Sequence, residues 1–76
     1  MREKIYAIVA EVLALPVEQL TDELSIGDIP QWNSMAQMRL TATLEERLEI
    51  EFPIEDLFDL TNVGAIVTEV EKVKNG

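Results

Sequence analysis

The chain has 76 residues and carries a formal charge of −9, from 15 acidic and 6 basic residues. It contains no cysteine and no histidine, which excludes disulfides, thiol nucleophiles, histidine acid–base pairs and the usual zinc ligand sets. A surface this acidic repels nucleic acid and anionic lipid and steers the protein toward partners with basic patches, although scattered acids also serve plain solubility.

The N-terminal segment predicts an amphipathic helix that Pro16 stops. Its apolar residues have the i, i+3, i+4, i+7, i+8 spacing of a helix with one buried face, namely Ile5, Ile8, Val9, Val12 and Leu13. Glu11 interrupts the apolar run short of a signal-peptide core, and no run approaches membrane-spanning length. We therefore expect a cytoplasmic protein without membrane partners. We also expect a monomer and, because the surface is acidic, no nucleic-acid partner.

Residues 17–31 predict a long ordered loop. Leu20, Leu24, Ile26 and Ile29 stand there among acids, a glycine and a proline, and such apolar side chains pin a loop to a core. The loop is longer than most connections in small domains, which indicates a functional role.

Three further helices are expected after this loop. The first runs from Ser34 to about Ile50 and ends before Pro53, and a short amphipathic segment follows at residues 54–60. Thr61 is the expected N-cap of the last helix, and Lys72 and Lys74 suit its C-terminal end. The apolar stripe of that helix is Val63, Ile66, Val67, Val70 and Val73. The expected fold is all-α: one domain over residues 1–76, a small four-helix bundle of three main helices and one short helix.

The helix from Ser34 has two opposite faces. Leu40, Leu44 and Leu48 recur every four residues and predict a core face. Met35 and Met38 lie nearly opposite, among glutamates that cannot be buried unpaired, which predicts an apolar patch in water and a docking site. The alternative is that both methionines pack on the short helix. The candidate partner-binding residues are Asn33, Met35, Met38, Arg39, Ala42, Glu45, Glu46 and Glu49.

Ser34 itself has two interpretations. Ser34 and Gln37 match a capping box, and Asn33 is equally able to cap the helix. The functional interpretation is that the free amides and dipole of a helix N-terminus favour a phosphate there. Trp32 is expected to anchor the preceding loop so that Ser34 stays exposed.

The acids of the first loop do not form a calcium site. An EF-hand loop that started at Asp22 would place Leu24 and Ile26 at ligand positions and Asn33 where the bidentate glutamate belongs. We expect no metal site in this chain.

Along its whole length the chain resembles the acyl carrier protein family. In that family a serine within Asp-Ser-Leu opens the second helix, and the matching residues here are Asn33-Ser34-Met35. The resemblance also covers the long first loop, the short third helix, and the stretches Leu44-Glu45-Glu46, Phe52-Pro53-Ile54 and Thr61-Asn62-Val63. It implies covalent 4′-phosphopantetheine on Ser34 and delivery of an acyl or aminoacyl thioester, without catalysis. The implied partners are a phosphopantetheinyl transferase, an acyl- or aminoacyl-activating enzyme, and downstream transferases with basic docking patches.

Two residues depart from the family pattern. Asn33 replaces the usual aspartate, and Arg39 stands at a position that is acidic in fatty-acid carriers. Both departures favour a carrier for a specialised lipid or polyketide pathway over a housekeeping role. Two alternatives stay open: an aminoacyl or peptidyl carrier of the D-alanyl type, and an unmodified helical adaptor that binds a partner through Met35 and Met38.

Overall fold

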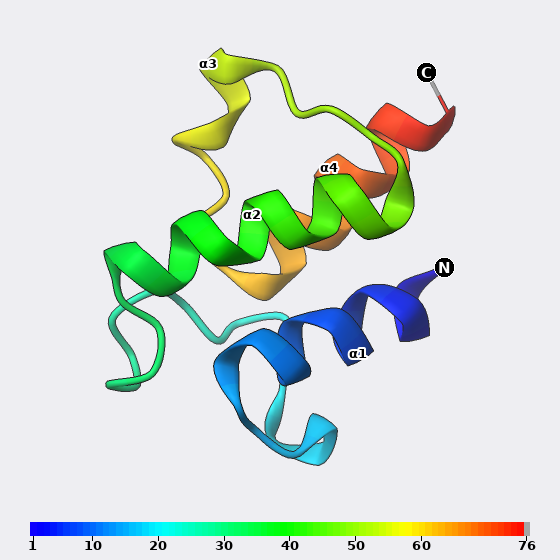
Figure 1. The fold of residues 1–76 in the computed structure, drawn as a ribbon. Coiled ribbons are helices and arrows are strands. Elements are labelled where there is room, and N and C mark those ends of the chain that lie inside the picture. Colours follow the sequence, from blue (N-terminus) through cyan, green and yellow to red (C-terminus); the bar gives the residue numbers. More distant parts are fainter. Residues whose placement is uncertain (76) are drawn as a thin grey trace.

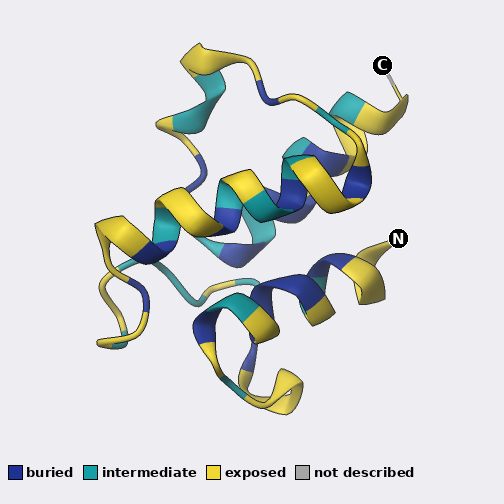
Figure 2. Cartoon of the chain, in the orientation of Figure 1, coloured by how far each residue is buried: buried dark blue, intermediate teal, exposed yellow. Residues whose placement is uncertain are grey.

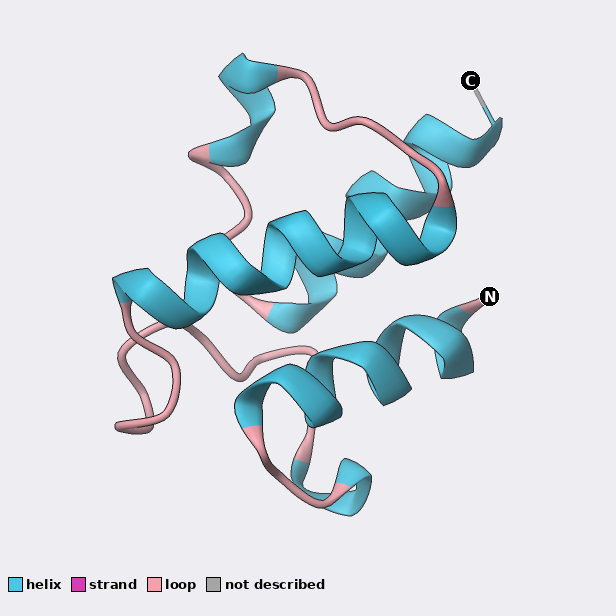
Figure 3. Cartoon of the chain, viewed as in Figure 1, coloured by secondary structure: helices cyan, strands magenta, loops and turns pink. Residues whose placement is uncertain are grey.

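The computed structural model describes residues 1–75, which form four α-helices and one short 3-10 helix (Figures 1 and 3). These elements are α1 (Arg2–Leu13), η1 (Val17–Gln19), α2 (Ser34–Leu48), α3 (Ile54–Leu57) and α4 (Val63–Asn75). Helices α1 and α2 pack against each other, α4 lies behind α2, and α3 stands at the upper edge of the view (Figure 1). The predicted all-α fold of three main helices and one short helix is confirmed.

A single apolar core joins the three long helices. Leu40, Leu44 and Leu48 of α2 are buried, as predicted, and the buried residues gather where the helices face one another (Figure 2). The predicted stripes of the other two helices also lie in this core, except that Val12 and Val73 are only partly buried at its edge. From these stripes the buried members are Ile5, Ile8, Val9 and Leu13 of α1, and Val63, Ile66, Val67 and Val70 of α4.

Residues in the left-handed conformation end both α1 and α2. Ala14 has φ 58°, and the amide of Leu15 donates to the carbonyl of Ala10 at 2.9 Å. Glu49 has φ 55° and closes α2 after Leu48, two residues before the predicted end. Pro16 therefore does not stop α1, because the chain has already left the helix at Ala14. After each left-handed residue, backbone amides donate hydrogen bonds to carbonyls in the last turn of the helix, which would otherwise lack a donor.

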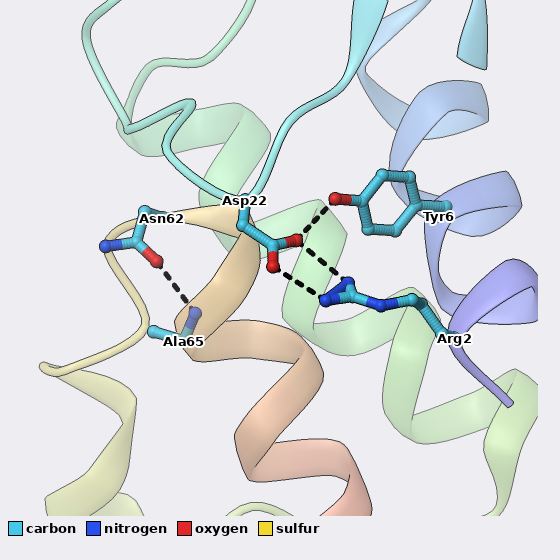
Figure 4. Close-up of polar contacts among 5 residues, drawn as sticks. All are labelled: Arg2, Tyr6, Asp22, Asn62 and Ala65. Atoms are coloured by element: carbon cyan, nitrogen blue, oxygen red, sulfur yellow. Dashed lines mark hydrogen bonds and ion pairs between the residues drawn. The ribbon is translucent and has the colours of Figure 1, made fainter. Parts of the chain in front are cut away.

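Asn62, and not Thr61, caps α4. The Asn62 side-chain oxygen accepts a hydrogen bond from the amide of Ala65 at 2.7 Å (Figure 4). The predicted cap, Thr61, is exposed, and its carbonyl accepts from the amide of Ile26 at 2.9 Å. This bond to the first loop holds Thr61 outside the helix, so the following asparagine takes the cap position.

The first loop is joined to the start of α4 through its backbone. The amide of Val63 donates to the carbonyl of Leu24 at 3.0 Å, and the amide of Gly64 donates to that of Asp22 at 2.9 Å. A side chain at Gly64 would place its Cβ 3.2 Å from Asp22, so the close approach of the two segments favours glycine. Leu20 is buried and Ile26 is partly buried, which confirms that apolar side chains hold this loop on the core.

The carboxylate of Asp22 also ties the loop to α1. Arg2 donates two hydrogen bonds to it, at 2.9 and 2.6 Å, and the Tyr6 hydroxyl donates a third (Figure 4). The Arg2 guanidinium lies 5.4 Å from the centre of the Tyr6 ring, a cation–π distance. The first loop is thus held from both sides, by α1 and by α4.

Two basic side chains fasten the far end of α2. Arg47 forms a two-pronged ion pair with Glu11 of α1, with distances of 3.0 and 2.5 Å. The Lys74 ammonium of α4 donates to the carbonyl of Leu48 at 2.9 Å. Lys74 therefore satisfies a terminal carbonyl of the neighbouring helix α2, and it also lies near the C-terminal end of its own helix, α4.

Over residues 1–75, none of the helices combines the length and the apolar character that a membrane crossing requires.

Candidate functional site

Ser34 is the first residue of α2, and its hydroxyl is not the helix cap. Asn33 caps the helix: its side-chain oxygen accepts from the amide of Ala36 at 3.0 Å, and its backbone is extended. Ser34 is exposed, and within residues 1–75 its hydroxyl forms no side-chain hydrogen bond. The capping-box prediction for Ser34 and Gln37 is wrong, because Asn33 turns the chain one residue earlier. The serine hydroxyl is left available for chemistry.

The N-terminal end of α2 fits a phosphate attached to Ser34. The first amides of an α-helix have no carbonyl partner within the helix, and here Asn33 satisfies only that of Ala36. The amides of Ser34 and Met35 therefore remain at the open end, where the helix dipole favours negative charge. Asn33 adds no negative charge beside this position, whereas an aspartate would.

Trp32 anchors the segment that leads into the serine, as the sequence predicted. Its side chain is fully buried, its amide donates to the carbonyl of Ile29 at 3.2 Å, and its carbonyl accepts from the amide of Gly27 at 2.9 Å. Its indole N–H donates to the Gln37 side-chain oxygen at 2.6 Å. The buried ring and these bonds fix the chain two residues before Ser34.

Met35 and Met38 form an exposed apolar surface next to the serine. Their side chains are 76% and 72% exposed, so the alternative in which they pack on the short helix is wrong. Ile54 and Phe58 of the α3 region are equally exposed, at 75% and 80%, and were not predicted as site residues. Their i, i+4 spacing, beside Leu57 and Leu60 that pack on the core, was a signal that could have identified them.

Of the remaining partner-binding candidates, most lie on the surface and one has a structural contact. Arg39, Ala42, Glu46 and Glu49 are exposed. Glu45 is partly buried, and its carboxylate accepts from the amide of Phe52 at 2.9 Å. This bond holds the turn that follows α2, so Glu45 serves the fold as well as the acidic surface.

An acidic cluster lies between α3 and α4, and sequence patterns did not indicate it. One carboxylate oxygen of Glu69 is buried and has no hydrogen-bond partner among residues 1–75. Burial raises the pKa of Glu69 above its ordinary value, and the neighbouring Asp56 and Asp59 raise it further, while Lys72 opposes them. The Lys72 ammonium lies 3.6 Å from the Asp56 carboxylate, so charges of both signs meet where the short helix joins the bundle.

The chain is similar in sequence to a known family and to two of its relatives. The phosphopantetheine attachment site family matches residues 3–70. An acyl carrier protein of Helicobacter pylori is 33% identical over 72 residues, which cover 95% of this chain and 92% of that protein. The meromycolate extension acyl carrier protein of Mycobacterium leprae is 29% identical over 67 residues; these cover 88% of this chain but only 58% of the relative's length.

A solved structure has the same fold. The solution structure of a holo acyl carrier protein from Geobacter metallireducens superposes with a TM-score of 0.85 at 31% identity, covering 97% of this chain and 85% of that one. Members of the matched family carry 4′-phosphopantetheine as a covalently attached cofactor. They are carrier proteins and not catalysts. The four helices, the exposed serine that opens α2 and these matches agree: the chain belongs to the acyl carrier protein family.

Proposed function

We propose that Ser34 is the residue to which 4′-phosphopantetheine is attached, and that the chain carries an acyl or aminoacyl group for a specialised biosynthetic pathway. The observation that carries the proposal is the exposed Ser34 hydroxyl at the first position of α2, left free because Asn33 is the cap. The only other serine, Ser25, is partly buried and donates its hydroxyl hydrogen bond to the carbonyl of Glu23 at 3.1 Å.

The attachment is a transfer from coenzyme A by a phosphopantetheinyl transferase that uses a divalent metal. The Ser34 oxygen forms a new bond to the phosphorus that bears the pantetheine. The bond to the adenosine half of coenzyme A breaks, and the serine proton is released. Once bound, the group supplies a terminal thiol on which cargo is held as a thioester. The protein's own contribution is to present the hydroxyl at a fixed helix end, where the amides of Ser34 and Met35 favour the phosphodiester charge.

The surface beside Ser34 supports docking of successive partner enzymes. Met35 and Met38 offer adaptable apolar area, and the exposed acids Glu46 and Glu49 lie farther along α2. Acids at the rim of a contact raise association rates with basic partners and keep the contacts reversible. Asn33 and Ala42 complete the proposed surface, with Glu45 contributing charge beside its structural bond.

Arg39 supports a specialised pathway. It is an exposed cation between the apolar Met35 and Met38 and the acids Glu46 and Glu49 farther along α2, so it disfavours partners that present a basic group at that point. One relative is named a meromycolate extension acyl carrier protein, and that name supports the proposal of a specialised pathway. An aminoacyl carrier of the D-alanyl type shares the attachment chemistry, and the identity of the group that loads the arm separates the two.

The attachment is tested with the two serines as a matched pair. Wild type, Ser34→Ala and Ser25→Ala are incubated with coenzyme A and a broad-specificity transferase, and the intact mass of each is measured. We expect wild type and Ser25→Ala to gain one phosphopantetheinyl group and Ser34→Ala to gain none. Modification of Ser34→Ala would refute the assignment. A wild-type protein that a competent transferase leaves unmodified would favour the adaptor alternative.

The cargo is identified from holo-protein isolated from its own cells. The mass of the intact thioester distinguishes an acyl chain from an amino acid, and incubation with acyl-activating and aminoacyl-activating enzymes tests which one loads the arm. Arg39→Glu adds a test of pathway: we expect slower loading by the cognate enzyme and faster handling by fatty-acid enzymes. Unchanged rates with both would remove the argument from Arg39.

A further inference from the structure

Gln37 connects two segments of the chain that meet at the first turn of α2. Its side-chain oxygen accepts from the indole N–H of Trp32 at 2.6 Å, and its side-chain nitrogen donates to the carbonyl of Leu60 at 2.7 Å. Leu60 lies in the link between α3 and α4, 23 residues away in the chain. Both ends of one amide group are thus used, each by a buried partner.

The bond to Trp32 reaches the site through the backbone. Trp32 stands two residues before Ser34, and its indole is fully buried, so its N–H needs an acceptor inside the protein. Gln37 is that acceptor, and it fixes the rotation of the ring in its pocket. The peptide that follows the ring carries Asn33, whose side chain caps α2 and whose carbonyl accepts the amide of Gln37 at 2.9 Å.

The bond to Leu60 determines where the Gln37 amide itself lies. The side chain is held between the segment that precedes α2 and the link that precedes α4. With only one of these two bonds, the amide group of Gln37 would be able to rotate. The two bonds, one at its oxygen and one at its nitrogen, hold the group in a single orientation. Leu60 is buried, so the carbonyl on which Gln37 depends belongs to the fixed core of the bundle.

We propose that Gln37 is a positioning residue for the attachment reaction: it locks Trp32 and so holds the Ser34 hydroxyl in the orientation that the transferase requires. This inference rests on the proposed attachment at Ser34. Gln37 acts through Trp32 and does not touch the reacting atoms. Its role differs from that of Met35 and Met38, which would contribute to binding a partner enzyme and not to the direction of the hydroxyl.

The substitutions separate the two bonds of Gln37. Gln37→Met keeps the length of the side chain and removes both bonds, while Gln37→Glu keeps an acceptor for Trp32 and removes the donor to Leu60. Gln19→Met is the matched control, because Gln19 is an exposed glutamine of η1. Each variant is first shown by circular dichroism to be fully folded at the assay temperature, and kcat and KM of the transferase are then measured separately.

We expect Gln37→Met to lower kcat about tenfold with little change in KM, because a misplaced reacting group can cost up to about a hundredfold. The indole N–H resonance of Trp32 should shift in Gln37→Met and stay near its wild-type position in Gln37→Glu, which should lose less kcat. Gln19→Met should match wild type. If Gln37→Met does not fold, Trp32→Phe decides, because it removes the indole donor of the same bond and should lower kcat with an unchanged KM.

A double variant tests whether Gln37 acts through the indole. Trp32→Phe removes the same hydrogen bond from the other side, so Gln37→Met combined with Trp32→Phe should lower kcat no further than Gln37→Met alone. Additive losses, or a folded Gln37→Met with wild-type kcat, would overturn the proposal. Failure of the wild-type protein to be modified would instead refute attachment at Ser34, so the two ideas fail by different results.

Discussion

The two faces of α2 give the sharpest test of the structure, through Leu44→Ala. The Leu44 side chain is fully buried in the core, and the substitution removes three carbons from it. At about 0.8 kcal/mol for each buried carbon, the lost transfer free energy is about 2.4 kcal/mol. The cavity left behind brings the expected loss to about 3–5 kcal/mol. A chain of this length has a total stability of about 4–11 kcal/mol, so the variant should be close to unfolding.

Met38→Ala is the matched substitution on the opposite face. The Met38 side chain is 72% exposed, so it loses little contact on truncation, and we expect a change of about 0.5 kcal/mol. Urea unfolding followed by circular dichroism measures both free energies, and transferase kinetics on Met38→Ala measure docking, which should weaken through a higher KM. Equal destabilisation by the two variants would refute the assignment of the faces. A stable Met38→Ala with normal kinetics would leave the fold intact and remove the docking role.

Three further predictions follow from individual contacts. Asn33→Ala should lower stability by about 1 kcal/mol in thermal unfolding, whereas Ser34→Ala should change it by less than about 0.5 kcal/mol, because only the asparagine is the cap; the reverse order would contradict the cap assignment. The double substitution Glu46→Lys and Glu49→Lys should lower the rate of modification by the transferase at low salt. The difference from wild type should shrink as added salt screens charges more than about 8 Å apart. Equal rates at low salt would mean that these acids serve only solubility. The raised pKa of Glu69 implies that its contribution to stability is full below its ordinary value of 4.5 and is lost as the pH rises through the folded-state pKa. Between pH 4.5 and pH 7, the free energy of unfolding should therefore fall less in Glu69→Gln than in wild type. If it changed with pH equally in the two proteins, Glu69 would not be the group responsible.

The helices and their buried faces were predictable because they depend on local periodicity. The leucines of α2 recur every four residues, and Leu40, Leu44 and Leu48 are all in the core. Exposure of Met35 and Met38 followed from the same geometry, since the glutamates beside them need water. These features depend on the spacing of apolar and charged residues and not on contacts from distant segments.

The caps were not predictable because each start offers two adjacent residues that are able to cap. Asn33 stands next to Ser34, and Thr61 next to Asn62, and local chemistry does not separate the members of either pair. A long-range bond decides the second pair, because the carbonyl of Thr61 is held by the amide of Ile26 in the first loop. The choice therefore depends on tertiary structure.

The contacts of Gln37 were not predictable for the same reason. Three residues after a serine, a glutamine matches a local capping motif, but its side chain instead bonds Trp32 and a carbonyl 23 residues away, that of Leu60. The left-handed conformation of Ala14 and Glu49 was equally hidden, because glycine or asparagine is the usual residue there. Contacts across the bundle, and not local preference, set these details of the candidate site.

The backbone bonds between the first loop and the start of α4 have a consequence for the order of folding. The amides of Ile26, Val63 and Gly64 take part in them, and they join positions separated by roughly forty residues, a closure that costs about 3 kcal/mol of chain entropy. The loop that leads to the serine thus gains part of its order when the last helix docks, and these amides should exchange with solvent in one common opening. On a growing chain, Ser34, the proposed attachment residue, would be presented in its final geometry only after α4 has been made. Modification at this site would then mark chains that have completed folding.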